Sequence, residues 1–96
     1  MDEARSYLGV FIIAPEKEES IDEVRKSISS VIGDNSGNVT EETLKGKRRL
    51  SYPVKKKAEG IYYEVVFSAD PGVIAKIKRQ CEIKADILRV LIDSKK

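Results

Sequence analysis

Residues 61–68 alternate in polarity with a period of two, and this alternation constrains the fold of the chain more than any other feature. The odd-numbered positions form one face, made of Ile61, Tyr63, Val65 and Phe67. The even-numbered positions form the other, made of Tyr62, Glu64, Val66 and Ser68. Because successive side chains of a β-strand point to opposite faces, the segment is predicted to be a strand with its odd-numbered face in the core.

Three further segments have the composition of strands. Residues 5–13 are β-branched and aromatic and end before a proline, and their nearly continuous apolar character favours an interior position in a sheet. Residues 39–54 are predicted to be extended, with Gly46 as a bulge or bend and with Pro53 at a sheet edge or strand end. Residues 87–93 alternate, with one face made of Leu88, Val90 and Ile92 and the other of Arg89, Leu91 and Asp93.

Two segments have helical spacing. Ser20 followed by Glu23 is a capping-box pattern, which predicts a helix start, and Gly33 is a natural C-terminal stop. The buried stripe of this helix is predicted to be Ile21, Val24, Ile28 and Val31. Asp70 before Pro71 predicts the N-cap of a second helix, whose stripe is Val73, Ile74, Ile77 and Cys81. Turns are expected at residues 34–38 and 55–60.

The predicted order is strand, helix, strand, strand, helix, strand. Two interleaved βαβ halves with right-handed crossovers give an α+β fold, the ferredoxin-like split βαβ (βαββαβ), with a four-stranded antiparallel sheet and both helices on one face. Residues 1–96 are expected to form a single domain. The opposite face of the sheet is left open to partners, but the fold by itself does not determine a function.

Composition excludes several classes of protein. The 96 residues include no His and one Cys, so the chain has no imidazole base, no internal disulfide and no thiolate zinc site. Lone Cys81 is expected to be a small buried apolar residue. We expect a reducing, cytoplasmic setting, since Asp2 and Glu3 do not suit a secretory signal and no stretch approaches the roughly 20 apolar residues that cross a bilayer.

The distribution of charge is the first functional indication. Residues 45–57 carry no acid and seven basic side chains, Lys45, Lys47, Arg48, Arg49, Lys55, Lys56 and Lys57. The rest of the chain holds 11 basic and 16 acidic residues. A charge run often does no more than solvate one face, but interleaving with Leu50, Tyr52 and Val54 indicates an ordered segment. Such a segment favours binding to a phosphate backbone.

Residues 46–55, with the sequence GKRRLSYPVK, carry a resemblance to a known family. They resemble the signature of the bacterial small-subunit (30S) ribosomal protein S6 family: Gly, any residue, a basic residue, a polar or charged one, Leu, Ser or Ala, Tyr, any residue, Ile, and a polar or basic residue. Val54 stands at the Ile position, and the other specified positions match. Residues 5–7 resemble the family's opening Arg-Arg-Tyr with Ser6 at the second Arg, and Arg89 falls at the basic position of the last strand.

The resemblance implies a non-enzymatic component of the small ribosomal subunit, located on the cytoplasmic ribosome. It implies binding to the central domain of small-subunit ribosomal RNA together with ribosomal protein S18, with no membrane, small-molecule substrate, metal or cofactor. The family positions indicate Arg5, Lys47, Arg48, Arg49, Lys56 and Arg89 as RNA contacts, and the basic segment adds Lys45, Lys55 and Lys57. Tyr52 could stack on a base, although its spacing from Leu50 and Val54 favours a half-buried packing role.

Three alternatives share this topology. An RNA recognition motif is disfavoured because Glu59 precedes Gly60 where a basic residue belongs and Tyr62 replaces a small residue. An acylphosphatase is disfavoured because residues 14–19 are acidic and lack the glycines of a phosphate loop, and no carboxylate pair suggests acid–base catalysis. A regulatory or assembly module that binds a protein or small ligand through its open sheet remains an alternative.

Overall fold

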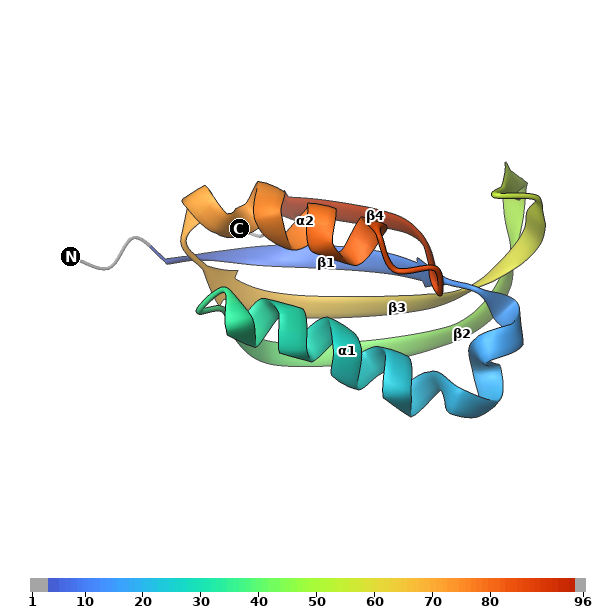
Figure 1. The fold of residues 1–96 in the computed structure, drawn as a ribbon, viewed down its shortest axis with the longest axis horizontal. Coiled ribbons are helices and arrows are strands. Elements are labelled where there is room, and N and C mark those ends of the chain that lie inside the picture. Colours follow the sequence, from blue (N-terminus) through green and yellow to red (C-terminus); the bar gives the residue numbers. More distant parts are fainter. Residues whose placement is uncertain (1–3, 95–96) are drawn as a thin grey trace.

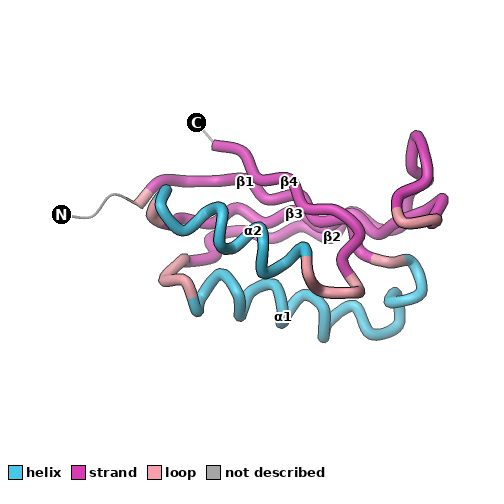
Figure 2. The backbone as a smooth tube through the Cα atoms, turned by 45° about the horizontal axis from the view of Figure 1, so that its top comes forward, coloured by secondary structure: helices cyan, strands magenta, loops and turns pink. Residues whose placement is uncertain are grey.

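The computed structural model describes residues 4–94, which form a four-stranded antiparallel sheet in the order β2-β3-β1-β4. The predicted ferredoxin-like order is confirmed, with α1 and α2 on the same face of the sheet (Figure 1). The backbone view in Figure 2 shows the same two layers. The strands are β1 (Arg5–Ile13), β2 (Asn38–Val54), β3 (Lys57–Ala69) and β4 (Ile87–Ser94). The helices are α1 (Ile21–Asp34) and α2 (Ile74–Glu82), preceded by the short 3-10 helices η1 (Pro15–Ser20) and η2 (Pro71–Val73).

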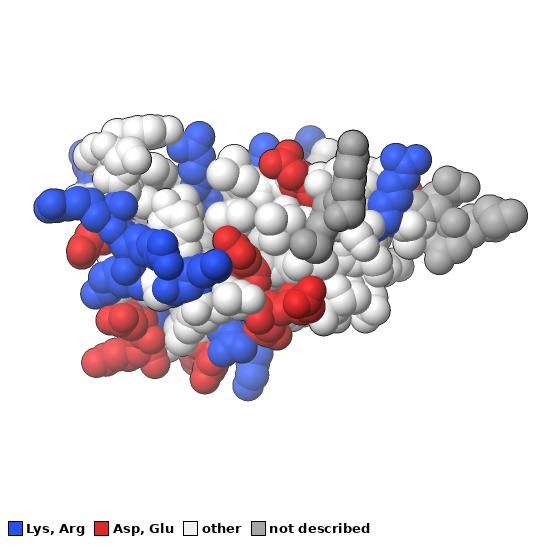
Figure 3. Space-filling model, turned by 180° about the vertical axis from the view of Figure 1, so that it is seen from behind, with Lys and Arg blue, Asp and Glu red and all other residues white. Residues whose placement is uncertain are grey.

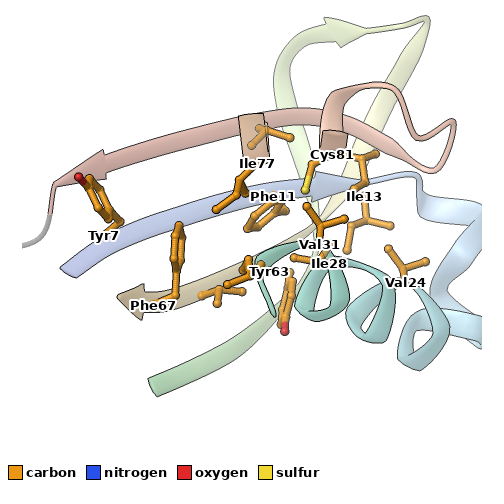
Figure 4. Packing of buried hydrophobic residues seen from close by; sticks show 14 of the residues in the cluster. Tyr7, Phe11, Ile13, Val24, Ile28, Val31, Tyr63, Phe67, Ile77 and Cys81 are labelled. Atoms are coloured by element: carbon orange, nitrogen blue, oxygen red, sulfur yellow. The ribbon is translucent and has the colours of Figure 1, made fainter. Parts of the chain in front are cut away.

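The core lies between the helices and the odd-numbered face of β3, as the period of two predicts. Tyr63, Val65 and Phe67 are fully buried, and they pack with Phe11 of β1 and Ile28 of α1 (Figure 4). The ring centroids of Phe11 and Tyr63 are 6.2 Å apart and tilted by 41°, a favourable arrangement for an aromatic pair. This face therefore holds the sheet and both helices together.

The helix α1 begins differently from the prediction. Its apolar stripe is confirmed, but the Ser20 side chain makes no capping hydrogen bond. The reason is that η1 runs directly into α1, so Ser20 is not at the extended position from which a side chain caps a helix (φ −114°, ψ 30°). Pro15 opens η1, where its fixed φ angle suits the first turn.

The end of α1 also differs, because Gly33 lies inside the helix. The left-handed residue is Ser36 (φ 63°), and the Gly37 N–H donates to the Ile32 carbonyl at 2.8 Å. The Ser36 N–H donates to the Gly33 carbonyl at 3.0 Å, which completes a Schellman motif. A Cβ atom at Gly37 would lie 2.6 Å from Ile32 Cγ2, so glycine is needed there for space.

The predicted cap of the second helical segment is confirmed. Asp70 Oδ1 accepts a hydrogen bond of 2.7 Å from the Gly72 N–H at the start of η2, which leads into α2. Ile77 and Cys81 are fully buried, and burial raises the pKa of the Cys81 thiol to about 11. Asn35 Nδ2 donates to Gln80 Oε1 at 2.9 Å, which links the two helices.

The sequence predicts that strand β4 alternates over residues 87–93, and this prediction is wrong at Leu88. The register against β1 shifts at this point, since Ile12 pairs with Arg89 but Ile13 pairs with Ile87, which leaves Leu88 as the extra residue. Leu88 therefore packs on the open face, while Val90 lies in the helix-covered core. A bulge adds one residue to a strand, so the side chains before the bulge point to the opposite face of the sheet from the one that strict alternation predicts.

The connection between β2 and β3 is shorter than the predicted turn at 55–60. Val54 pairs with Lys57, which leaves a two-residue loop in which Lys55 (φ 50°) and Lys56 (φ 67°) both have positive φ. Positive φ at both positions is typical of a type I′ hairpin turn, which usually carries Asn-Gly. The predicted bulge at Gly46 is confirmed by its φ of 91° and by the register shift between Leu44 and Gly46.

This turn yields a prediction of stability. Lys56→Gly is expected to raise the free energy of unfolding by about 1 kcal/mol, because glycine adopts positive φ without the steric cost that lysine has there. Lys78→Gly, on the exposed side of α2, should lower it by about 1 kcal/mol, since glycine weakens a helix interior. Urea unfolding of both variants measures the difference, and a loss of stability in both would contradict the assignment of the turn.

Candidate nucleic-acid interface

The distal part of the β2–β3 hairpin bends out of the line of the sheet (Figure 1). We call residues 45–57 the basic arm. Leu50 of the arm is buried on the open face against Ile12, Ala14 and Leu88. Strands β3 and β1 lie between β2 and β4 in the sheet, so for Leu50 to share a cluster with Leu88 of β4 the arm must curl across the open face.

Two polar contacts hold the basic arm against β4. Lys55 Nζ donates to the Ile87 carbonyl oxygen at 3.2 Å. Arg89 Nη1 donates to the Tyr52 hydroxyl oxygen at 2.8 Å. The curled arm thereby brings Arg89, which is 37 positions from Tyr52 in sequence, beside the arm's own basic side chains.

Three lysines of the basic arm have carboxylate partners. Lys57 Nζ lies 2.9 Å from Glu16 Oε2, Lys47 Nζ lies 3.3 Å from Glu18 Oε1, and Lys45 Nζ lies 3.9 Å from Glu64 Oε1. The hydrogen bond from Lys57 lowers the pKa of Glu16. All three pairs are well exposed to solvent, and exposed pairs contribute little to stability, so these lysines can exchange partners readily.

Three other basic side chains of the arm have no ion-pair partner in the described part of the chain. Arg48, Arg49 and Lys56 are exposed, and none of them forms an ion pair with a side chain of residues 4–94. Seen from behind, Lys and Arg side chains gather at the end of the molecule that carries the arm, with acidic side chains beside them (Figure 3). Eight predicted residues thus contribute to the surface of the arm and the adjoining part of β4: Lys45, Lys47, Arg48, Arg49, Lys55, Lys56, Lys57 and Arg89. Lys47 and Lys57 turn toward η1 through their ion pairs, whereas Lys55 and Arg89 are held between the arm and β4.

Arg5 is not part of this surface. It opens β1 opposite Ala69, whereas the arm extends beyond the other end of the sheet, where Ile13 pairs with Ile61. Any contact that Arg5 makes with RNA must therefore be separate from those of the arm.

Tyr52 does not have the half-buried packing role that its spacing favours. Its side chain is 60% exposed, while Leu50 is buried and Val54 is partly buried. No pairing with β3 occurs between Arg49 and Val54, so the alternation of a regular sheet does not hold over these residues. The contact between Tyr52 and Arg89 was also missed from sequence, since it depends on the bend of the arm.

A second polar cluster lies between α1 and β2, away from the arm. Glu42 Oε1 accepts hydrogen bonds from Arg25 Nη2 at 2.7 Å and from the Tyr63 hydroxyl at 2.8 Å. The Arg25 guanidinium lies 5.8 Å from the centre of the Tyr63 ring, within the range of a cation–π contact. Burial, followed by the bond to Glu42, raises the pKa of Tyr63 to about 12, and the bond from Arg25 lowers the pKa of Glu42. This cluster gives the buried hydroxyl a partner and ties α1 to β2.

The lowered pKa of Glu42 predicts a pH-dependent stability. The ionised Glu42 is favoured in the folded state, so its contribution is complete above the ordinary value of 4.5 and is lost as the pH falls through the lowered pKa. Glu42→Gln should therefore be less stable than the parent at pH 7, and the difference should shrink as the pH falls below about 4.5. Urea unfolding between pH 7 and pH 3 measures this difference. A difference that stays constant with pH would show that the charge of Glu42 is not what stabilises the fold.

Within residues 4–94 no group of three or more acidic, Cys or His residues is placed to hold a metal ion. No helix in that same range is long and apolar enough to cross a membrane.

Fold and site together define a class: a ferredoxin-like βαββαβ domain with a basic arm curled over its open sheet face. Within that class, residues 6–93 match the family described as ribosomal protein S6, and the chain belongs to this family. The family resemblance and the fold predicted from the sequence are thereby confirmed.

Relatives agree with this family assignment, and solved structures share the fold. The small ribosomal subunit protein bS6 of Streptomyces coelicolor is 36% identical over 92% of this chain and 93% of its own length. The bS6 protein of Desulforamulus reducens is 37% identical over 92% and 94%. The 30S ribosomal protein S6 of Thermotoga maritima has the same fold, with a TM-score of 0.87 at 24% identity over 96% of this chain and 88% of that one. The C-terminal domain of the Mycobacterium tuberculosis MgtC protein also shares the fold, with a TM-score of 0.68 at 11% identity over 99% and 92%.

Proposed function

We propose that this protein is a structural component of the small ribosomal subunit that binds the central domain of small-subunit ribosomal RNA together with ribosomal protein S18. Membership of the ribosomal protein S6 family supports the assignment to the small subunit in the cytoplasm. The observation that supports the RNA-binding role is the basic arm, which presents Arg48, Arg49 and Lys56 without a carboxylate partner among residues 4–94. The proposal assigns no catalytic step to any residue.

The basic side chains are proposed to act in three groups. Arg48, Arg49, Lys56 and Arg89 are the direct phosphate contacts, because Arg can grip a phosphate with two parallel N–H groups and Lys supplies a mobile point charge. Lys45, Lys47, Lys55 and Lys57 position the arm in the free protein and can turn to phosphates in the complex. Arg5 contacts a separate part of the RNA.

Structured RNA is commonly read through its shape and backbone, so an arm of this kind can bind without reading base edges. Contacts of this kind predict a marked salt dependence. Roughly 3–6 phosphate contacts should give a log–log slope of about −2 to −5.

The test is filter binding of the full chain to a central-domain RNA fragment, with and without ribosomal protein S18, at 50–200 mM salt. We expect binding that is strongest with both proteins present and that weakens steeply with salt. Co-sedimentation of the protein with small subunits in cell extracts is the matching observation in cells. A flat salt response, or sedimentation free of ribosomal particles, would contradict the proposal.

A further inference from the structure

The curled arm encloses a groove on the open face of the sheet. The groove has a volume of about 310 Å³ and lies between the arm and strands β1, β3 and β4. Its lining includes Ile12, Leu50, Tyr52, Tyr62, Arg89 and Leu91. No carboxylate lines it, and Arg89 is its only charged lining residue within residues 4–94. The groove is therefore apolar inside and positive at its edge.

Tyr52 has the features of a stacking platform. Its side chain is 60% exposed, so its ring is available for contact with a ligand. Its hydroxyl oxygen accepts the 2.8 Å hydrogen bond from Arg89, which restricts the orientation of both side chains. An exposed ring fixed beside a guanidinium group offers a flat ligand a stacking surface and an anion partner in the same place.

The positive charge near the groove indicates which kind of ligand fits it. Lys55, which follows the lining residue Val54 in sequence, donates to the Ile87 carbonyl oxygen, and the six other cations of the basic arm are not among the lining residues. A purely apolar side chain from a protein partner would fill the groove without using this positive edge. A nucleotide matches both parts, since its base is flat and apolar on its faces and its phosphate is anionic.

From these observations we infer that the groove binds an unpaired base of single-stranded RNA. The base stacks on Tyr52, and the adjoining phosphate lies against Arg89. This rests on the proposed function, because it assumes that RNA runs along the basic arm. It adds a specific feature, namely that the protein recognises an unstacked nucleotide in addition to the RNA backbone.

The experiment compares a short oligoadenylate with an abasic oligoribonucleotide of the same length and charge. Both are titrated into the full-length parent and into Tyr52→Ala, with binding followed by fluorescence anisotropy and backbone amide NMR. The parent should bind the oligoadenylate roughly 5- to 150-fold more tightly than the abasic chain, the range expected for one stacked base. Tyr52→Ala should remove most of that preference, whereas Tyr52→Phe should keep it. Ile83→Ser, at an apolar side chain that is 78% exposed on the C-cap of α2, is the matched control and should bind like the parent.

The outcomes separate this inference from the proposed function. Equal affinity for the two oligomers, or no binding of either, overturns the nucleotide site. Protection of the Tyr52 and Leu91 amide signals by ribosomal protein S18 alone, with no effect of oligoadenylate, overturns it in favour of a protein occupant. In each of these cases the proposed function survives if the parent still binds the central-domain RNA, and it fails if that binding is also absent.

Discussion

Reversing the charges of Arg48, Arg49 and Lys56 to Glu is expected to weaken binding to the central-domain RNA at least about 100-fold at physiological salt. Each substitution removes a proposed phosphate contact and adds a repulsive charge. All three side chains are exposed and unpaired within residues 4–94, and glutamate at position 56 keeps the Cβ atom of lysine, so the free energy of unfolding should change by less than about 0.5 kcal/mol. Filter binding beside ribosomal protein S18 measures the affinity, and urea unfolding measures the stability.

The matched control reverses three lysines on the helices, Lys26, Lys76 and Lys78. This variant has the same change in net charge as the arm variant, but its substitutions lie on the elements that cover the other face of the sheet. It should keep most of the parent's affinity. If the two variants lose affinity equally, net charge and not the arm determines binding. If the arm variant binds like the parent, the arm is not the RNA interface.

Ile28→Ala is expected to lower the free energy of unfolding by about 2–4 kcal/mol. Ile28 is fully buried in the centre of α1 and belongs to the cluster that joins the helix to β3. Its truncation therefore leaves a cavity that the surrounding helix and sheet can fill only in part. Urea unfolding gives the free energy. Because the core lies on the helix side of the sheet and the arm on the other, the folded fraction should bind RNA like the parent at low temperature.

The control is Ile83→Ala, the same truncation of isoleucine to alanine at a residue that is 78% exposed. It should change the free energy of unfolding by no more than about 0.5 kcal/mol. A stability of Ile28→Ala within error of the parent would mean that the α1 stripe does not pack as the structure shows.

The sequence predicts the regular parts of the fold well for a physical reason. Over residues 61–68 one face meets the helices and the other does not, so burial follows the period of the strand. The stripes of α1 and α2 are predictable for the same reason. Local capping is less predictable, since Ser20 and Gly33 have suitable chemistry but the chain continues helically through both positions.

The sequence predicts which basic residues the arm carries, but it does not predict how the arm is arranged against β4. A basic run in sequence identifies the cations of the arm without any knowledge of the structure. The contact of Arg89 with Tyr52 depends on the curl of the hairpin, and the facing of Leu88 depends on a one-residue bulge. Neither the curl nor the bulge leaves a periodic signal that could be recognised in advance.

The tether between the arm and β4 has a consequence for the order of biosynthesis. Translation produces every cation of the hairpin before it reaches the Ile87 carbonyl and the Arg89 guanidinium, to which Lys55 and Tyr52 are bound. An incomplete nascent chain thus carries the charge of the mature protein's hairpin without its final shape. The curled shape of the hairpin therefore depends on contacts that can form only after β4 has been synthesised and has paired with β1.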